Sequence, residues 1–178
     1  PHRWVNAVKK CVADIASNFT TNRMLIDYEE RFYNKLAQRK KLMLDKNYIM
    51  ARQIAAWKRK VSAAWDNIVI RDVKRAEIES EAMYVGKKYH FELTIDLAGL
   101  QKEDIGAELV VATQIEAGQA ANVVETRRLE IVASDDKSVT LALDYAPEHT
   151  GMFDVALRVF PVNDNLEHRM DFALVKWA

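Results

Sequence analysis

The hydrophobic pattern divides the chain into two parts with different periods. Between Trp4 and Ile15 the apolar residues recur every three or four positions, which places them on one stripe of a helix. Residues 2–85 contain neither glycine nor proline, and this also favours helix in the first half. The members of the stripe are Trp4, Val8, Cys11, Val12 and Ile15.

A second helix is predicted after the interruption at Ser17-Asn18. Thr20 or Thr21 can accept hydrogen bonds from the first free backbone amides of such a helix. We expect it to end near Arg39-Lys40-Lys41, because positive charge is favourable at the carbonyl end. Its buried face would hold Met24 or Leu25, Tyr28, Phe32 and Leu36.

A third helix is predicted from about Asp45, where apolar residues alternate by four and three. The pattern is shorter than the three to four heptads that indicate an extended coiled coil. We therefore expect this seam to pack within the chain or on a longer parent protein. Its members are Met50, Ile54, Trp57, Val61, Ala64 or Trp65, and Ile68.

From about Asp66 the period changes to two, most clearly from Tyr89 to Leu97. Turn residues separate several such segments, and no helix-length segment lies between them to connect parallel strands. The further strand candidates are Val69 to Val73, Ile78 to Val85, Glu108 to Glu116, Val123 to Ala133, Ser138 to Tyr145, Phe153 to Phe160 and Met170 to Lys176.

The predicted fold is therefore α+β. About three N-terminal helices precede an antiparallel immunoglobulin-like β-sandwich of seven or eight strands, although the disulfide cysteines of antibody domains are absent. The predicted domains are terminal helices over residues 1–44, a connecting helix over 45–65 and the sandwich over 66–178.

Composition and charge narrow the classes of partner. Lys plus Arg and Asp plus Glu number 26 each, so the formal net charge is zero and no bulk field attracts nucleic acid or anionic lipid. We expect neither nucleic acid nor membrane as a partner. The only cysteine, Cys11, cannot form an internal disulfide, and no apolar segment indicates export or a membrane span. We expect a cytoplasmic protein.

No residue pattern indicates a catalytic, cofactor or metal site. His2, His90, His149 and His168 lack partners at metal-ligand spacing, and we expect His90 to be solvated. Cys11 is interpreted as packing on its helix, and no nucleophile elbow or phosphate loop is present. The pairs Glu29-Glu30 and Asp135-Asp136 are interpreted as solvated or turn residues rather than as a glycosidase pair.

Aromatic and basic side chains remain as candidates for binding. Trp4, Trp57 and Trp65 are interpreted as packing residues, whereas Trp177, beside Lys176 at the end of the sequence, is the least constrained of the four as a candidate for stacking on a sugar. The basic stretch around Arg39-Lys40-Lys41 is interpreted as a solvated helix end. Substrate-binding residues cannot be assigned from these patterns.

Ordered short motifs give the chain a family resemblance. The first are Trp4-Val5, Lys9-Lys10, Phe19-Thr20-Thr21-Asn22-Arg23-Met24, Tyr28 and Phe32-Tyr33. The later ones are Trp57-Lys58, Trp65, Val85-Gly86, Gly99-Leu100, Glu103-Asp104-Ile105, Arg158-Val159-Phe160-Pro161 and Leu174-Val175-Lys176-Trp177-Ala178. In this order the motifs resemble the carboxyl-terminal region of the shorter bacterial and archaeal alpha-glucan phosphorylases.

The resemblance implies a parent enzyme that cleaves alpha-1,4-glucan with phosphate to give glucose 1-phosphate, using pyridoxal phosphate. It places the family's catalytic machinery upstream of Pro1, and no lysine here has the glycine-containing setting of the cofactor lysine. We expect a carboxyl-terminal fragment that is inactive alone, binds no cofactor itself, and braces the catalytic lobes or assembles subunits. The implied partners are the rest of the catalytic domain, a second copy, or an alpha-glucan. The alternatives are a carbohydrate-binding module for glycogen or starch and a structural interaction domain.

Overall fold

The computed structural model describes residues 2–16, 18–75, 83–113 and 122–178. The chain forms two compact units, Pro1–Gln53 and Ile54–Ala178. The boundary between them lies within one helix. Each unit is described by itself.

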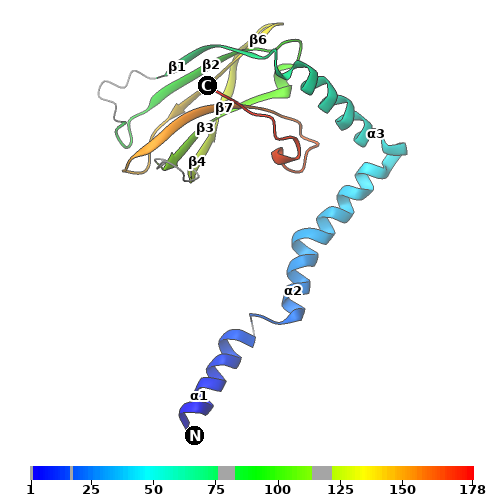
Figure 1. Cartoon of the computed structure of the whole chain (residues 1–178), viewed down its shortest axis with the longest axis vertical. Coiled ribbons are helices and arrows are strands. Elements are labelled where there is room, and N and C mark those ends of the chain that lie inside the picture. Colours follow the sequence, from blue (N-terminus) through cyan, green and yellow to red (C-terminus); the bar gives the residue numbers. More distant parts are fainter. Residues whose placement is uncertain (1, 17, 76–82, 114–121) are drawn as a thin grey trace. The chain divides into compact units, whose positions relative to one another are not determined.

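The first unit is helical (Figure 1). Helix α1, His2–Cys11, continues into a π-helical segment, Val12–Ala16. Helix α2, Thr21–Tyr28, begins after Thr20, whose side chain accepts a hydrogen bond of 3.2 Å from the Arg23 amide. The predicted threonine cap is thus confirmed at Thr20. A second π-helical segment, Glu29–Tyr33, leads into α3, Asn34–Trp65.

Helix α3 corrects the predicted division into about three separate helices. Its 32 residues form one element with a kink, and Arg39-Lys40-Lys41 lies a few residues before that kink. The helical backbone continues past Lys41 as far as this kink, although the stretch contains neither glycine nor proline. Backbone angles are non-helical at Asp45, Lys46, Asn47 and Tyr48, which marks a kink near the predicted start of the third helix.

The apolar stripe of the first unit is exposed. None of the described residues of α1, α2 and the two π-helical segments is buried. Trp4 is 72% exposed and Phe19 is 77% exposed, and Cys11 is exposed as well. The interpretation of Trp4 and Cys11 as packed residues is therefore wrong for the structure of this chain, because the stripe identifies an apolar face without identifying what covers it.

The second unit begins with the last turns of α3, whose seam packs as predicted. Ile54, Val61 and Trp65 are buried along the helix, and Ile68 is buried just after it. Trp57 and Ala64 pack against the same core. The seam is thus satisfied within the chain.

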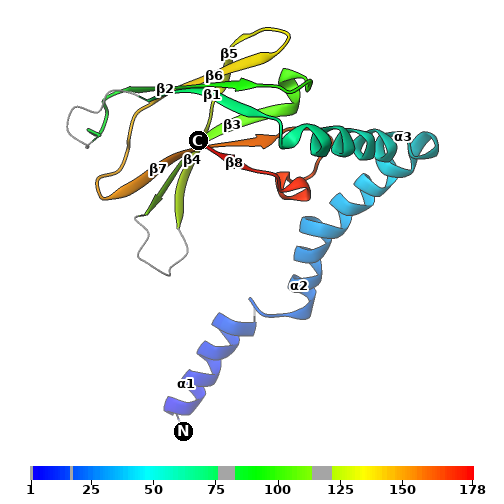
Figure 2. The same ribbon diagram turned by 45° about the horizontal axis from the view of Figure 1, so that its top comes forward.

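Eight strands follow among the described residues, arranged in two four-stranded antiparallel sheets (Figure 2). One sheet has the order β1-β2-β6-β5 and the other β4-β3-β7-β8. The strands are β1 Val69–Arg75, β2 Tyr89–Asp96, β3 Ile105–Thr113, β4 Val123–Arg128, β5 Glu130–Ser134, β6 Ser138–Tyr145, β7 Phe153–Pro161 and β8 Lys176–Trp177.

The two sheets share one hydrophobic core. Leu93 of β2 and Leu141 of β6 contribute to it from one sheet, and Leu109 of β3 and Leu157 of β7 from the other. Alternation in β2 is confirmed, because Tyr89, Phe91, Leu93 and Ile95 are buried while the residues between them are more exposed. The mixed helix-and-strand class and the antiparallel pairing are confirmed.

Two strand predictions are corrected. The segment Val123 to Ala133 divides at Leu129, which is 2% exposed, so that β4 and β5 belong to different sheets. The segment Met170 to Lys176 is not a strand, because Arg169–Phe172 forms a 3₁₀ turn before the short β8. The alternation of apolar and polar residues continues where the chain passes from one sheet to the other. The pattern therefore does not show that β4 and β5 are separate strands.

Two further strand predictions fall partly outside the described residues. Positions 78–82 of the segment Ile78 to Val85 lie outside them, and residues 83–85 are not in a strand. Positions 114–116 of the segment Glu108 to Glu116 also lie outside them. The described part of that segment belongs to β3, which begins earlier, at Ile105.

The last residues of the chain return to α3 and to the sheet of β7. Trp177 pairs with Arg158, and the Lys176 ammonium donates to the carbonyl oxygens of Asp66 and Ile68 at 3.2 and 2.8 Å. The Lys58 ammonium donates to the carbonyl of Asp171 at 2.6 Å. These contacts hold the C-terminal segment against the end of α3.

Candidate functional site

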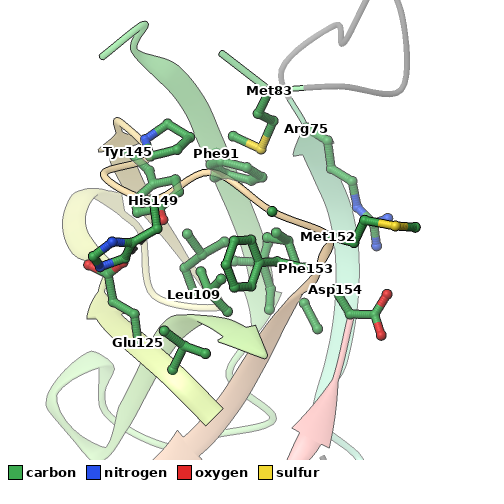
Figure 3. Close-up of a pocket in the computed structure, with 17 residues that line it drawn as sticks. Arg75, Met83, Phe91, Leu109, Glu125, Tyr145, His149, Met152, Phe153 and Asp154 are labelled. Atoms are coloured by element: carbon green, nitrogen blue, oxygen red, sulfur yellow. Dashed lines mark hydrogen bonds between the residues drawn. The ribbon is translucent and has the colours of Figure 1, made fainter. Parts of the chain in front are cut away.

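A cavity of about 510 Å³ opens between the two sheets, where β6 ends and β7 begins (Figure 3). It lies within the second unit. Its inner wall is apolar and comes from three strands that also build the core. The wall residues are Phe91 of β2, Leu109 and Val111 of β3, and Phe153, Val155 and Leu157 of β7.

Tyr145 and Glu125 form a polar pair in the wall of this cavity. The Tyr145 hydroxyl donates to Oε2 of Glu125 at 3.1 Å, and the tyrosine is 7% exposed. Burial disfavours the phenolate and, with the adjacent Glu125 carboxylate, raises the pKa of Tyr145 to about 12. The hydroxyl therefore remains a protonated donor throughout the physiological range.

Arg127 fixes the other oxygen of Glu125. Its Nε donates to Oε1 of Glu125, and its Nη2 donates to Glu148 at 3.2 Å. The side chain of Glu125 is 15% exposed, so this ion pair is partly shielded from water. The carboxylate is thus held in place by two donors at the edge of the cavity.

Gly151 leaves room for the ring of Phe153, which lines the cavity. Its φ of +148° is one that L side chains rarely adopt, and a Cβ built there would lie 3.1 Å from the Phe153 ring. In Figure 3, Glu125 and His149 lie on one side of this ring, and Arg75 and Asp154 lie on the other. The cavity therefore combines an aromatic centre with polar groups at its edges.

The second cluster of charge is built around Glu108, which is 6% exposed and is the buried charged residue of the described core. It lies opposite Arg158 in the register of β3 and β7. One of its oxygens accepts from both Arg158 Nε and Arg169 Nη1. The two guanidinium groups also lie over rings, Arg158 over Trp177 at 5.6 Å and Arg169 over Phe160 at 5.2 Å. This network ties the C-terminal segment to the sheet.

The tryptophans differ in environment. Trp57 donates from Nε1 to Asp104 at 2.7 Å and meets Phe172 edge-on at 5.4 Å between ring centres. Trp65 is buried, so the packing interpretation is confirmed for both residues. Trp177 is 57% exposed but lies outside the cavity, with Arg158 over its ring.

The histidines and paired carboxylates have ordinary structural surroundings. His90 is exposed as predicted; its Nδ1 lies 2.7 Å from Asp144, and this hydrogen bond raises the pKa of His90 above its usual value. His168 Nδ1 accepts from the Met170 amide, and His149 is exposed beside the cavity. Asp135 accepts from the amides of its own turn, as predicted, while Glu29-Glu30 is exposed on its helix.

The described residues were compared with what a metal ion and pyridoxal phosphate require. Across these residues no three His, Cys, Asp or Glu side chains are grouped to hold a metal ion. Pyridoxal phosphate does not fit the cavity, because no lysine is among the described residues that line it. The Glu125 carboxylate, which accepts from Tyr145, would also repel the phosphate group. Within the described part of the chain, no helix is long and apolar enough to cross a membrane.

Comparison with known proteins connects this architecture to a family. A family model for the glycogen phosphorylase C-terminal domain matches residues 65–178, which is more than half of the chain. The chain belongs to the glycogen phosphorylase C-terminal domain family. The matched region of this family begins at the last residue of α3 and includes both sheets, the cavity and the Glu108 network.

Full-length relatives extend the similarity of this phosphorylase domain into the helices. Maltodextrin phosphorylase from Thermococcus litoralis is 27% identical over 98% of the chain, which corresponds to 20% of the relative. Glycogen phosphorylase from Mycobacterium tuberculosis is 26% identical over 90% of the chain and 16% of the relative. The chain thus spans a fifth or less of the length of these curated relatives. No solved structure gives a significant match.

Sequence reasoning did not single out the cavity or the Glu108 network. Glu108 could have been noticed as a carboxylate inside the apolar run of β3, where an unpaired charge would be costly. Gly151 lies two residues before Phe153, and its local sequence does not indicate a cavity. Nothing in the local pattern connects Glu108 with Arg169, which is 61 positions away.

Proposed function

We propose that the chain serves as a non-catalytic C-terminal part of an alpha-glucan phosphorylase, bracing its catalytic lobes or assembling its subunits. The family match and the full-length relatives support this assignment. In this proposal the rest of the enzyme supplies pyridoxal phosphate and carries out phosphorolysis in the cytoplasm.

The observation that carries the proposal is the exposed apolar stripe of the first unit. Large apolar side chains on α1, the adjoining π-helical segment and α2 are exposed, although their spacing is that of a buried helix face. Contiguous exposed apolar surface of this kind marks interaction sites on soluble proteins. We assign residues 1–44 to the catalytic body, with this face against it. The apolar stripe comprises Trp4, Val8, Cys11, Val12 and Ile15.

The immunoglobulin-like classification of the accessory domain is part of the same proposal. With β1 to β8 named A, B, C, C′, D, E, F and G in chain order, the sheets have the orders A-B-E-D and C′-C-F-G. Constant-type immunoglobulin domains have sheets ABED and CFG, so the order here adds one strand to the second sheet. This agreement supports a scaffold role, since such sandwiches occur widely without catalytic residues.

Sedimentation velocity tests whether the apolar stripe is an association surface. We expect the 178-residue chain to self-associate as its concentration rises, because its stripe lacks a natural cover. The double substitution Val8→Glu and Val12→Glu places two charges on the stripe and should give a monomer. The control Asn6→Glu with Lys10→Gln makes the same change in net charge on the opposite helix face and should associate like the wild type. A wild-type chain that stays monomeric at every concentration would count against the docking role.

A further inference from the structure

We propose that residues 45–48 form a two-state hinge in α3, which interconverts between the kinked helix of the structure and one continuous helix. The kink contains a left-handed turn that follows an extended Asp45. Lys46, Asn47 and Tyr48 have φ values of 45°, 58° and 63°, with ψ values of 46°, 49° and 30°. The hinge lies wholly within the first unit, Pro1–Gln53.

The left-handed turn is strained. In this conformation the Cβ of an L residue comes close to the following carbonyl oxygen, so glycine adopts it readily, asparagine and aspartate do so occasionally, and other residues rarely do. Residues of this kind normally occur singly, whereas three follow one another here and two of them are Lys46 and Tyr48. The strain therefore favours an alternative in which all three residues become right-handed.

Neither burial nor a helix-breaking residue fixes the kink. Residues 45–48 are all exposed, so packing on a core does not impose the left-handed turn on them. Residues 34–65 contain neither glycine nor proline, which are the common causes of sharp kinks in helices. A continuous helix would also align apolar residues that recur every seven positions along one face. These residues are Leu36, Met43, Met50 and Trp57.

The straight form is opposed by the low helix propensity of two hinge residues. Asp45 and Asn47 are weak helix formers, because their short polar side chains compete for nearby backbone groups and favour caps and turns. The extended backbone of Asp45 is that of a residue that precedes a helix. Backbone strain in one form and low helix propensity in the other thus act against each other within one short segment, as a two-state hinge requires.

Interconversion changes how the apolar stripe is presented. The stripe and α2 precede the hinge in the chain, so straightening α3 turns them relative to the residues that follow the hinge, up to Gln53. A protein surface that fits one form would hold α3 in that form. The hinge itself rests on the backbone angles, and only this consequence for docking on the catalytic body rests on the proposed function.

Double electron-electron resonance on the full chain tests the inference. Cys11→Ser removes the only native cysteine, and spin labels are then attached at Lys35→Cys and Gln53→Cys, which replace exposed residues. These positions are separated by about five helical turns, so a continuous helix places them on the same side, about 27 Å apart. The kinked form gives a second distance. An excess of unlabelled chain removes distances between copies.

Two substitutions should move the populations in opposite directions. Tyr48→Gly relieves the left-handed turn and weakens the continuous helix, so it should raise the ratio of kinked to straight form by about tenfold. Asn47→Ala replaces a turn-forming residue with the best helix former and should lower this ratio by about tenfold. Lys41→Gly is the control, because this residue is helical in both forms and its substitution should leave the ratio unchanged.

Opposite shifts in Tyr48→Gly and Asn47→Ala, with Lys41→Gly like the wild type, would support the hinge. An unchanged distance distribution in both hinge variants, or shifts of both in the same direction, would overturn it. The spin labels report on α3 alone, whereas sedimentation reports on association through the apolar stripe. The hinge and the proposed function can therefore fail separately.

Discussion

Replacing Glu108 by alanine is expected to lower the free energy of unfolding by about 3 kcal/mol, one of the two largest effects we predict. The substitution leaves two guanidinium groups without the carboxylate that both contact. Most of the loss should come from Arg158, whose side chain is 16% exposed; the Arg169 side chain is 39% exposed, so water compensates part of its loss. Chemical unfolding of the two proteins provides the measurement.

The control for this prediction is Glu103→Ala, which removes a carboxylate from an exposed position in the same unit. Its effect should stay within about 0.5 kcal/mol. Amide exchange provides a second readout, because the Ala178 amide donates to the Leu157 carbonyl at 2.9 Å and should lose protection when the network is broken. A Glu108→Ala protein as stable as Glu103→Ala would show that the network does not hold the C-terminal segment.

The second large effect is a loss of stability in alkaline solution caused by Tyr145. Its pKa is about 12 in the folded chain, against a reference value of 10.0. Between these values the unfolded chain releases the phenolic proton while the folded chain retains it. The free energy of unfolding therefore falls as pH rises, by about 1.4 kcal/mol per pH unit, and the contribution is fully present below pH 10.

Urea unfolding at a series of pH values separates this contribution from that of other groups. The variant Tyr145→Phe should lack it, so the stability difference between the two proteins should change by about 2 kcal/mol between pH 10 and pH 12. Tyr84→Phe replaces an exposed tyrosine and should keep the wild-type slope. If the free energy of unfolding fell equally steeply with pH in the wild type and in Tyr145→Phe, the Tyr145 hydroxyl would not be held in a desolvated site.

The local pattern of apolar and polar residues was sufficient to predict the elements that pack one face against the core or have a neighbour on each side. The period of two from Tyr89 to Leu97 predicted β2 because that strand has a sheet neighbour on each side and one buried face. The seam from Ile54 to Ile68 predicted its buried residues, since a helix on a core must hide one face. In both cases the residue type at each position reports burial directly.

Long-range arrangement could not be predicted in the same way. The sheet change at Leu129 depends on how β4 and β5 find different partners, which a uniform strand pattern does not encode. The cavity needs side chains from strands distant in sequence, and the Glu108 network needs Arg169 from the last turn of the chain. The stripe from Trp4 to Ile15 shows that a face is apolar, but it does not identify the surface that covers it.

A phosphorolysis assay on the purified chain tests the proposed non-catalytic role most directly. The chain is incubated with maltodextrin, phosphate and pyridoxal phosphate, with the Thermococcus litoralis maltodextrin phosphorylase as positive control. We predict that the control enzyme releases glucose 1-phosphate while the chain releases no more than a protein-free blank. Release of glucose 1-phosphate by the chain, reduced by Glu125→Gln or Phe153→Ala, would contradict the account and place catalysis in the cavity.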